Sequence, residues 1–162
     1  MRANKLTVLA ATAAIVGLAA PAAWAGSLPK VPDAGGHLAN SQFQIRPASI
    51  QISGDGSFYF DGRRKPHHHA APLKWTSWTS TGGRGSGFNW VNNCMPNCAS
   101  GTFHLYPVKL HVWRPRHVGG HFIFTRMTVT YTDGHPRGVP HNKDVFTVSH
   151  KSGGLYFWNY PS

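Results

Sequence analysis

The stretch HFIFTRMTVTYT, residues 121–132, decides the fold class because its residues alternate in polarity with a period of two. One face carries the apolar residues Ile123, Met127, Val129 and Tyr131. The other face carries Phe122, Phe124, Arg126, Thr128, Thr130 and Thr132. Such alternation is typical of a β-strand with one buried and one wetter face, and threonine is enriched in strands. We therefore predict a strand whose odd-numbered face lies in the core.

Other apolar runs, separated by Gly, Pro and Asp turns, extend this pattern along the chain. They cover residues 43–52, 57–60, 73–80, 87–91, 102–113, 145–149 and 155–160. No segment shows a helical period. About seven or eight short strands without helices predict an all-β fold, an antiparallel β-sandwich that is immunoglobulin-like or related. We expect residues 43–162 to form this single β domain.

Two prolines and one glycine-rich segment are expected to interrupt the predicted strands. Pro47 and Pro107 interrupt apolar runs, and the parity of the apolar positions changes after each proline. Because proline within a strand is confined to edges or bulges, we expect a bulge or a strand switch at both points. The segment TSTGGRGSGFNW, residues 79–90, is interpreted as a flexible loop between strands.

The N-terminus has the pattern of a cleavable signal peptide. Arg2 and Lys5 precede an apolar run, and Ala23-Trp24-Ala25 matches a small-x-small cleavage site. We predict a signal peptide over residues 1–25 and a flexible lead-in over residues 26–42. The processed protein is then secreted, extracellular or associated with the cell wall, and it retains no membrane span.

The composition is strongly basic and favours anionic partners. The chain has 16 Lys and Arg residues against 5 acidic residues, and all the acids are aspartates. Removing Arg2 and Lys5 leaves 14 basic residues, a net charge of +9. A charge of this sign suits nucleic acids, anionic wall polymers or acidic polysaccharides. Paired-carboxylate hydrolases need two acids held close together, and three of the aspartates precede glycine in turns. We therefore expect no catalytic activity.

The only two cysteines lie in the stretch WVNNCMPNCASGT, residues 90–102. Cys94 and Cys98 flank a Met-Pro-Asn turn that can bring their Cα atoms within the roughly 4.4–6.8 Å that a disulfide needs. In an oxidising compartment we predict a Cys94–Cys98 disulfide. A copper site that adds Met95 and His104, and a thiol redox pair, remain the alternatives.

Three loops combine basic residues with histidines. They are DGRRKPHHHAAP at 61–72, RPRHVGGH at 114–121 and DGHPRGVPHNK at 133–143. Arginine and lysine clusters hold phosphate or sulfate groups, and histidine gains charge as the pH falls through about 6.5. The predicted anion-binding residues are Arg63, Arg64, Lys65, Arg114, Arg116 and Arg137. The weaker candidates for a metal site are His67, His68, His69 and His104.

Four motifs together resemble a known group of proteins. They are the Gly-Asp-Gly-Ser turn in SGDGSFYF, the Trp-x-Ser-Trp form in LKWTSW, the Cys-x3-Cys-Ala-x-Gly loop and the FTRMTVTYT strand. Small secreted β-rich proteins of unknown function, common in actinobacteria, show a similar set. The resemblance covers residues 43–132 and implies an exported protein with a disulfide, without a known activity.

These observations lead to one functional hypothesis and two alternatives. The hypothesis is a secreted, non-catalytic protein that binds anionic cell-envelope or extracellular polymers through its basic His/Arg loops. The alternatives are a secreted copper- or zinc-binding protein and a secreted enzyme with an unrecognised site. We expect a monomer without a cofactor.

Overall fold

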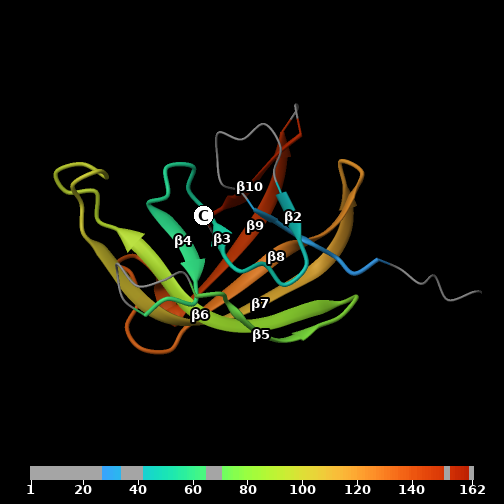
Figure 1. Cartoon of the computed structure of the whole chain (residues 1–162), viewed down its shortest axis with the longest axis horizontal. Helices are drawn as coiled ribbons and strands as arrows, with labels where there is room; N and C mark the ends of the chain where they lie inside the picture. The colour runs from blue at the N-terminus through green and yellow to red at the C-terminus, as the bar shows by residue number, and fades with distance from the viewer. Residues whose placement is uncertain (1–26, 34–41, 65–70, 152–153, 161–162) are drawn as a thin grey trace, which may run out of the picture.

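The computed structural model describes residues 27–33, 42–64, 71–151 and 154–160, and these residues form an antiparallel β structure (Figure 1). The predicted signal peptide and residues Lys65, His67, His68 and His69 lie outside the described residues. The elements are β1 (Val31–Asp33), β2 (Gln42–Gln44), β3 (Ile50–Gln51), β4 (Phe58–Asp61), β5 (Lys74–Trp78), β6 (Gly82–Asn92), β7 (Phe103–Val118), β8 (His121–Tyr131), the 3₁₀ turn η1 (Pro140–Asn142), β9 (Lys143–Lys151) and β10 (Leu155–Asn159).

One large sheet organises the molecule. Its strands follow the order β10-β9-β8-β7-β6-β4-β3, and β5 pairs with β6 beside β4. The strands β1 and β2 form a separate two-stranded sheet. Every strand pair is antiparallel, and β6 to β10 form a consecutive meander. Within the described residues, no helix is long and apolar enough to cross a membrane.

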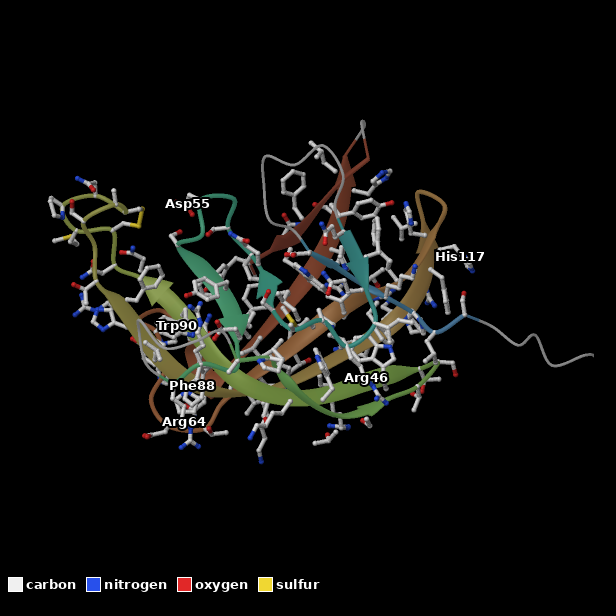
Figure 2. The ribbon with its side chains drawn as sticks, in the orientation of Figure 1. Arg46, Asp55, Arg64, Phe88, Trp90 and His117 are labelled. Carbon is white, nitrogen blue, oxygen red and sulfur yellow. A yellow bond between two sulfur atoms is a disulfide. The ribbon has the colours of Figure 1, made fainter. Side chains whose placement is uncertain are left out.

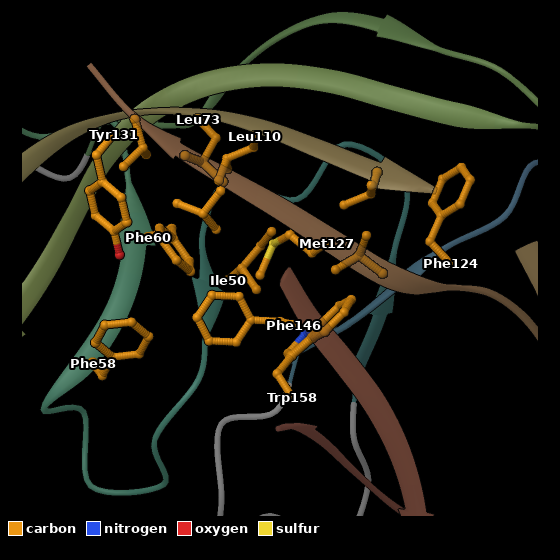
Figure 3. Packing of buried hydrophobic residues seen from close by; sticks show 14 of the residues in the cluster. Ile50, Phe58, Phe60, Leu73, Leu110, Phe124, Met127, Tyr131, Phe146 and Trp158 are labelled. Atoms are coloured by element: carbon orange, nitrogen blue, oxygen red, sulfur yellow. The ribbon is translucent and has the colours of Figure 1, made fainter. Parts of the chain in front are cut away.

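The large sheet curls so that its two ends face each other across the core (Figure 3). Phe58 and Phe60 of β4 lie 6.0 and 6.2 Å from Phe146 of β9, measured between ring centroids, although three strands separate β4 from β9 in the sheet. The prediction of an all-β, antiparallel, sandwich-like fold is confirmed. Its two layers are the two halves of one curled sheet. We call the side of the sheet that faces the core the inner face and the opposite side the outer face.

The predicted faces of residues 121–132 are confirmed, with one exception. Met127 and Val129 have no exposed surface, and Tyr131 is 3% exposed. Phe124, which the alternation placed on the wetter face, is also fully buried and packs against Trp78 with ring centroids 5.4 Å apart. Phe124 belongs to the same core cluster as Met127, and the facing strand is irregular here, since Arg114 has a φ of 56° and is not paired with Thr125. The alternation of faces therefore changes between residues 124 and 127.

The glycine-rich segment is a strand, so its interpretation as a flexible loop is wrong. Gly83 and Gly85 of β6 face inward, where a Cβ atom would lie 2.7 Å from the Trp78 ring and 2.8 Å from the Trp75 ring. The glycines therefore leave room for two indoles to lie flat against the strand. A register shift between Trp75 and Ser77 lets both tryptophans face inward in spite of their odd spacing.

The two prolines behave differently. At Pro47 the expected strand switch is confirmed, because β2 belongs to the small sheet and β3 to the large one. At Pro107 the expected bulge is wrong, since β7 pairs with β6 in unbroken register from Phe103 to Trp113. The parity of the apolar residues changes there because both faces of the sheet are covered. Phe103 joins an aromatic cluster on the outer face, whereas Val108 faces the core.

Residues 29–33, within the predicted lead-in, pack against the large sheet. Val31 is 1% exposed, and the backbone of Lys30 bonds to Phe122 and Phe124 along the free edge of β8. The indole of Trp158 donates to the carbonyl oxygen of Pro32 at 3.1 Å, and that of Trp78 donates to Pro29. This strap, residues 29–33, closes the edge of the sheet.

Candidate functional site

A row of lysines crosses the outer face of the sheet. The register pairs Lys74 with Ser86, Ser86 with Lys109, Lys109 with Thr130, and Thr130 with Lys143. Paired residues in adjacent antiparallel strands share a face, and neighbouring strands lie about 4.8 Å apart. The three lysines therefore recur about every 10 Å, with a hydroxyl side chain between each two. All three are exposed. We call Lys74, Lys109 and Lys143 the lysine row.

One end of the lysine row borders a hollow of about 270 Å³, which we call the cationic pocket. Lys74 and Lys109 line it together with Arg64, whose guanidinium lies 5.9 Å from the centre of the Phe88 ring. Figure 2 shows Arg64 beside Phe88 on β6. The Ser86 hydroxyl lines the same hollow, whereas the Thr132 hydroxyl there donates to the Pro107 carbonyl, and no acidic residue lines it. Three cations and the Ser86 hydroxyl suit an oxyanion such as phosphate or sulfate.

Further basic residues extend the positive surface beyond the lysine row. On the outer face, Arg84 pairs with His111, and Arg126 pairs with Trp113. Partial burial, and next the charge of Arg84, lower the pKa of His111 below its usual value. His111 therefore stays neutral until the medium is more acidic than an ordinary histidine requires. The positive charge of this outer face near neutral pH therefore comes from Lys74, Lys109, Lys143 and the arginines rather than from His111.

A second hollow, about 570 Å³ in volume, lies over β3 and β4. We call it the aromatic groove. Its lining is Ala48, Ser49, Gln51, Gly56, Tyr59, Asp61, Arg63, Ala71, Pro72 and Phe103. Beneath it the Trp90 ring lies parallel to that of Tyr59, with the ring centroids 5.8 Å apart. Trp90 is only 2% exposed although it lies on the outer face, because Arg63, Tyr59 and Phe103 cover it.

Asp61 organises the aromatic groove from below. Its side chain is 6% exposed and accepts three hydrogen bonds, from the Trp90 indole at 2.8 Å, the Arg63 backbone N–H at 2.9 Å and the Arg63 Nε at 2.5 Å. Arg63 also donates to the Tyr59 hydroxyl at 2.9 Å. Burial raises the pKa of Tyr59, so this hydroxyl stays protonated. Arg63–Asp61 is the one ion pair among the residues that the structure describes.

The two neighbouring arginines therefore have different environments. The charge of Arg63 is balanced by Asp61, which makes the aromatic groove close to neutral. Arg64 is exposed and has no carboxylate partner within the described part of the chain. Because Arg63 and Arg64 are adjacent in an extended segment, they line different hollows.

The remaining predicted basic residues do not gather at this site. Arg114 and Arg116 are exposed near the far end of β7, and Arg137 is exposed in the segment after β8. Arg114 lies five positions from Lys109, roughly 16 Å along an extended strand. Lysines 74, 109 and 143 were missed as site residues because they are far apart in the sequence. Only the strand register could have brought them together.

Three other aspartates, Asp33, Asp55 and Asp144, lie in hydrogen-bonded or buried positions. Asp55 caps its turn, where hydrogen bonds from the side chain and backbone of Ser57 lower its pKa to about 2. Asp33 accepts a bond from the backbone of Gln51. Asp144 is 2% exposed beside Tyr131, and burial raises its pKa. One of its carboxyl oxygens has no hydrogen-bond partner in the described structure.

The cysteine pair forms a disulfide rather than a free thiol pair. Cys94 and Cys98 are joined, with Cα atoms 3.7 Å apart, closer than the sequence had led us to expect. The Asn92 side chain tightens the loop, since it accepts from the Cys94 N–H and donates to the Cys98 carbonyl, both at 2.8 Å. His104 is exposed on β7 opposite Val91. Among the described residues, no three His, Cys, Asp or Glu side chains gather as a metal site would require.

Comparison of the chain with models of protein families, with curated proteins and with solved structures found no match.

Proposed function

We propose that the protein is a secreted, non-catalytic binder of anionic polymers, acting outside the cell or at the cell envelope. The observation that carries this proposal is the lysine row, in which three exposed lysines recur about every 10 Å across the sheet. A polymer with repeated phosphate, sulfate or carboxylate groups can neutralise several of these charges at once. The Cys94–Cys98 disulfide supports an oxidising environment.

The proposed binding surface lies on the sheet rather than on the loops. Arg64 remains part of it, through the cationic pocket. Arg63 contributes mainly to structure, because Asp61 and Tyr59 hold its guanidinium. A rigid sheet holds its charged groups at fixed distances, which lowers the entropic cost of binding compared with flexible loops.

The test compares two triple variants that lose the same charge. Lys74→Ala/Lys109→Ala/Lys143→Ala removes the lysine row, and Arg114→Ala/Arg116→Ala/Arg137→Ala removes three exposed cations elsewhere. Each lysine beside an anionic surface contributes about 1 kcal/mol, so the first variant should bind inorganic polyphosphate about 100-fold more weakly. The second should lose only a fewfold, because salt screens charges beyond about 8 Å.

The assay is a titration with polyphosphate at low and at physiological salt. Equal losses in the two triple variants would mean that net charge alone governs binding, and the lysine row would then have no special role. Unchanged affinity in the first variant would contradict the proposal outright.

A further inference from the structure

The aromatic groove and the cationic pocket border the same short segment of the chain. Asp61 and Arg63 line the groove, whereas Gly62 and Arg64 line the pocket. Downstream, Ala71 and Pro72 line the groove and Lys74 lines the pocket. The hydrogen bond from the Gly62 N–H to the Ala71 carbonyl, at 2.8 Å, holds these two stretches side by side. One extended ligand can therefore reach both hollows.

The two hollows differ in charge. In the aromatic groove the cation of Arg63 is compensated by Asp61 at 2.5 Å. In the cationic pocket Arg64, Lys74 and Lys109 face no carboxylate. The groove therefore suits an uncharged group, and the pocket suits an anion. A ligand that fills both must carry neutral and anionic parts next to each other.

The polar groups of the groove suit hydroxyl groups of a ligand. The Tyr59 hydroxyl accepts from Arg63 and keeps its own proton for donation. The Ser49 hydroxyl is exposed, and the Gln51 side-chain amide has no hydrogen-bond partner in the described part of the chain. Ala48, Ala71, Pro72 and Phe103 provide apolar surface between these groups. Alternating polar and apolar contacts of this kind fit a sugar ring, and the volume of about 570 Å³ is ordinary for a ligand site.

The same geometry disfavours a nucleobase. Binding of single-stranded nucleic acid uses exposed aromatic faces on which bases stack. Here Trp90 is 2% exposed, and the guanidinium of Arg63 lies 5.1 Å from its ring centre and 5.6 Å from that of Tyr59. The rings are covered, so the groove presents polar edges instead of open stacking surfaces.

From these observations we infer that the polymer is an anionic glycan, whose sugar ring lies in the aromatic groove while a phosphate, sulfate or carboxylate group of the same chain lies in the cationic pocket. This inference rests on the proposed function and specifies its ligand. The groove supplies selectivity for the sugar, and the lysine row supplies most of the affinity.

The test uses two polyanions of matched charge, dextran sulfate as an anionic glycan and inorganic polyphosphate as an anion without sugar. The variant Ser49→Ala/Gln51→Ala removes two hydrogen-bonding side chains from the groove without changing any charge. Loss of two hydrogen bonds should weaken dextran sulfate binding about 10- to 30-fold, with polyphosphate affinity unchanged within twofold. Tyr59→Phe, which removes only a hydroxyl group, should give a smaller loss in the same direction.

The outcomes separate the inference from the proposed function. If the groove variant binds dextran sulfate as wild type does while the lysine-row variant binds both polymers weakly, the inference is overturned and the proposed function stands. If the lysine-row variant binds both polymers normally, the proposed function and the inference fall together. Equal weakening of both polymers by the groove variant would overturn the inference too. So would tight binding of single-stranded DNA that the groove variant weakens as strongly as that of dextran sulfate.

Discussion

The Asp61 carboxylate links the stability of the fold to the shape of the aromatic groove, and its removal gives a quantitative prediction. Asp61→Ala leaves the Trp90 indole N–H and the Arg63 backbone N–H without their acceptor. An unsatisfied buried donor costs about 1–3 kcal/mol. The Arg63 side chain is 27% exposed, so it can turn toward water and recover part of its lost interaction.

We therefore expect Asp61→Ala to lower the free energy of unfolding by about 3–5 kcal/mol, the range for removing one partner of a buried pair. Asp61→Asn keeps an oxygen acceptor and should cost less, about 1–3 kcal/mol. The assay is urea unfolding followed by tryptophan fluorescence, since Trp90 itself bonds to Asp61. Asp133→Asn, at an exposed aspartate, is the matched control and should change stability by less than about 0.5 kcal/mol.

A loss below about 1 kcal/mol in Asp61→Ala would refute the reasoning, because the three hydrogen bonds would then contribute no more than one average bond. A loss as large in Asp133→Asn would show that net charge, rather than the buried pair, controls stability.

Three further predictions follow from the same structure. Gly83→Ala places a methyl group against Trp78 and should destabilise the fold by about 1–3 kcal/mol, whereas Ser86→Ala on the opposite face of β6 should be nearly neutral in thermal unfolding. Burial raises the pKa of Asp144 in the folded state. The contribution of Asp144 to stability is therefore full below the unfolded pKa near 3.8 and is lost as the pH rises through the folded pKa. Asp144→Asn should flatten this part of the stability–pH curve, and an unchanged curve would contradict the raised pKa of Asp144. Cys94→Ser/Cys98→Ser opens a short ring and should lower stability by about 2 kcal/mol without unfolding the domain, as circular dichroism can check.

The fold class was predictable from the sequence because strand periodicity is a local property. Met127, Val129 and Tyr131 could be assigned to the core from their alternation alone. The glycine-rich strand β6 was not recognised, since its glycines are explained by Trp75 and Trp78 of the neighbouring strand. Phe103 led to the incorrect prediction of a bulge at Pro107 for a related reason. It packs on the outer face of a sheet that is covered on both sides.

The site was less predictable than the fold. Local clusters of charge in the sequence directed attention to Arg114, Arg116 and Arg137, which the sheet does not bring together. Lys74, Lys109 and Lys143 stand singly in the sequence, and only the register of β5 to β9 aligns them. The Arg63–Asp61 pair separates two arginines that look equivalent in the sequence.

The strap over residues 29–33 has a consequence for the order in which the molecule can assemble. The hydrogen bond from Trp158 to Pro32 joins residues 126 positions apart, and Lys30 bonds to the backbone of Phe122 and Phe124 in β8. Contacts of such long sequence separation slow folding, and the Trp158 contact cannot form until β10 has been synthesised. A nascent chain that ends before β10 therefore has the strap attached to β8 without its bond to Trp158. Deleting β10 would remove the Trp158 bond to Pro32 and so loosen the strap, which Lys30 and Trp78 would still hold to the large sheet.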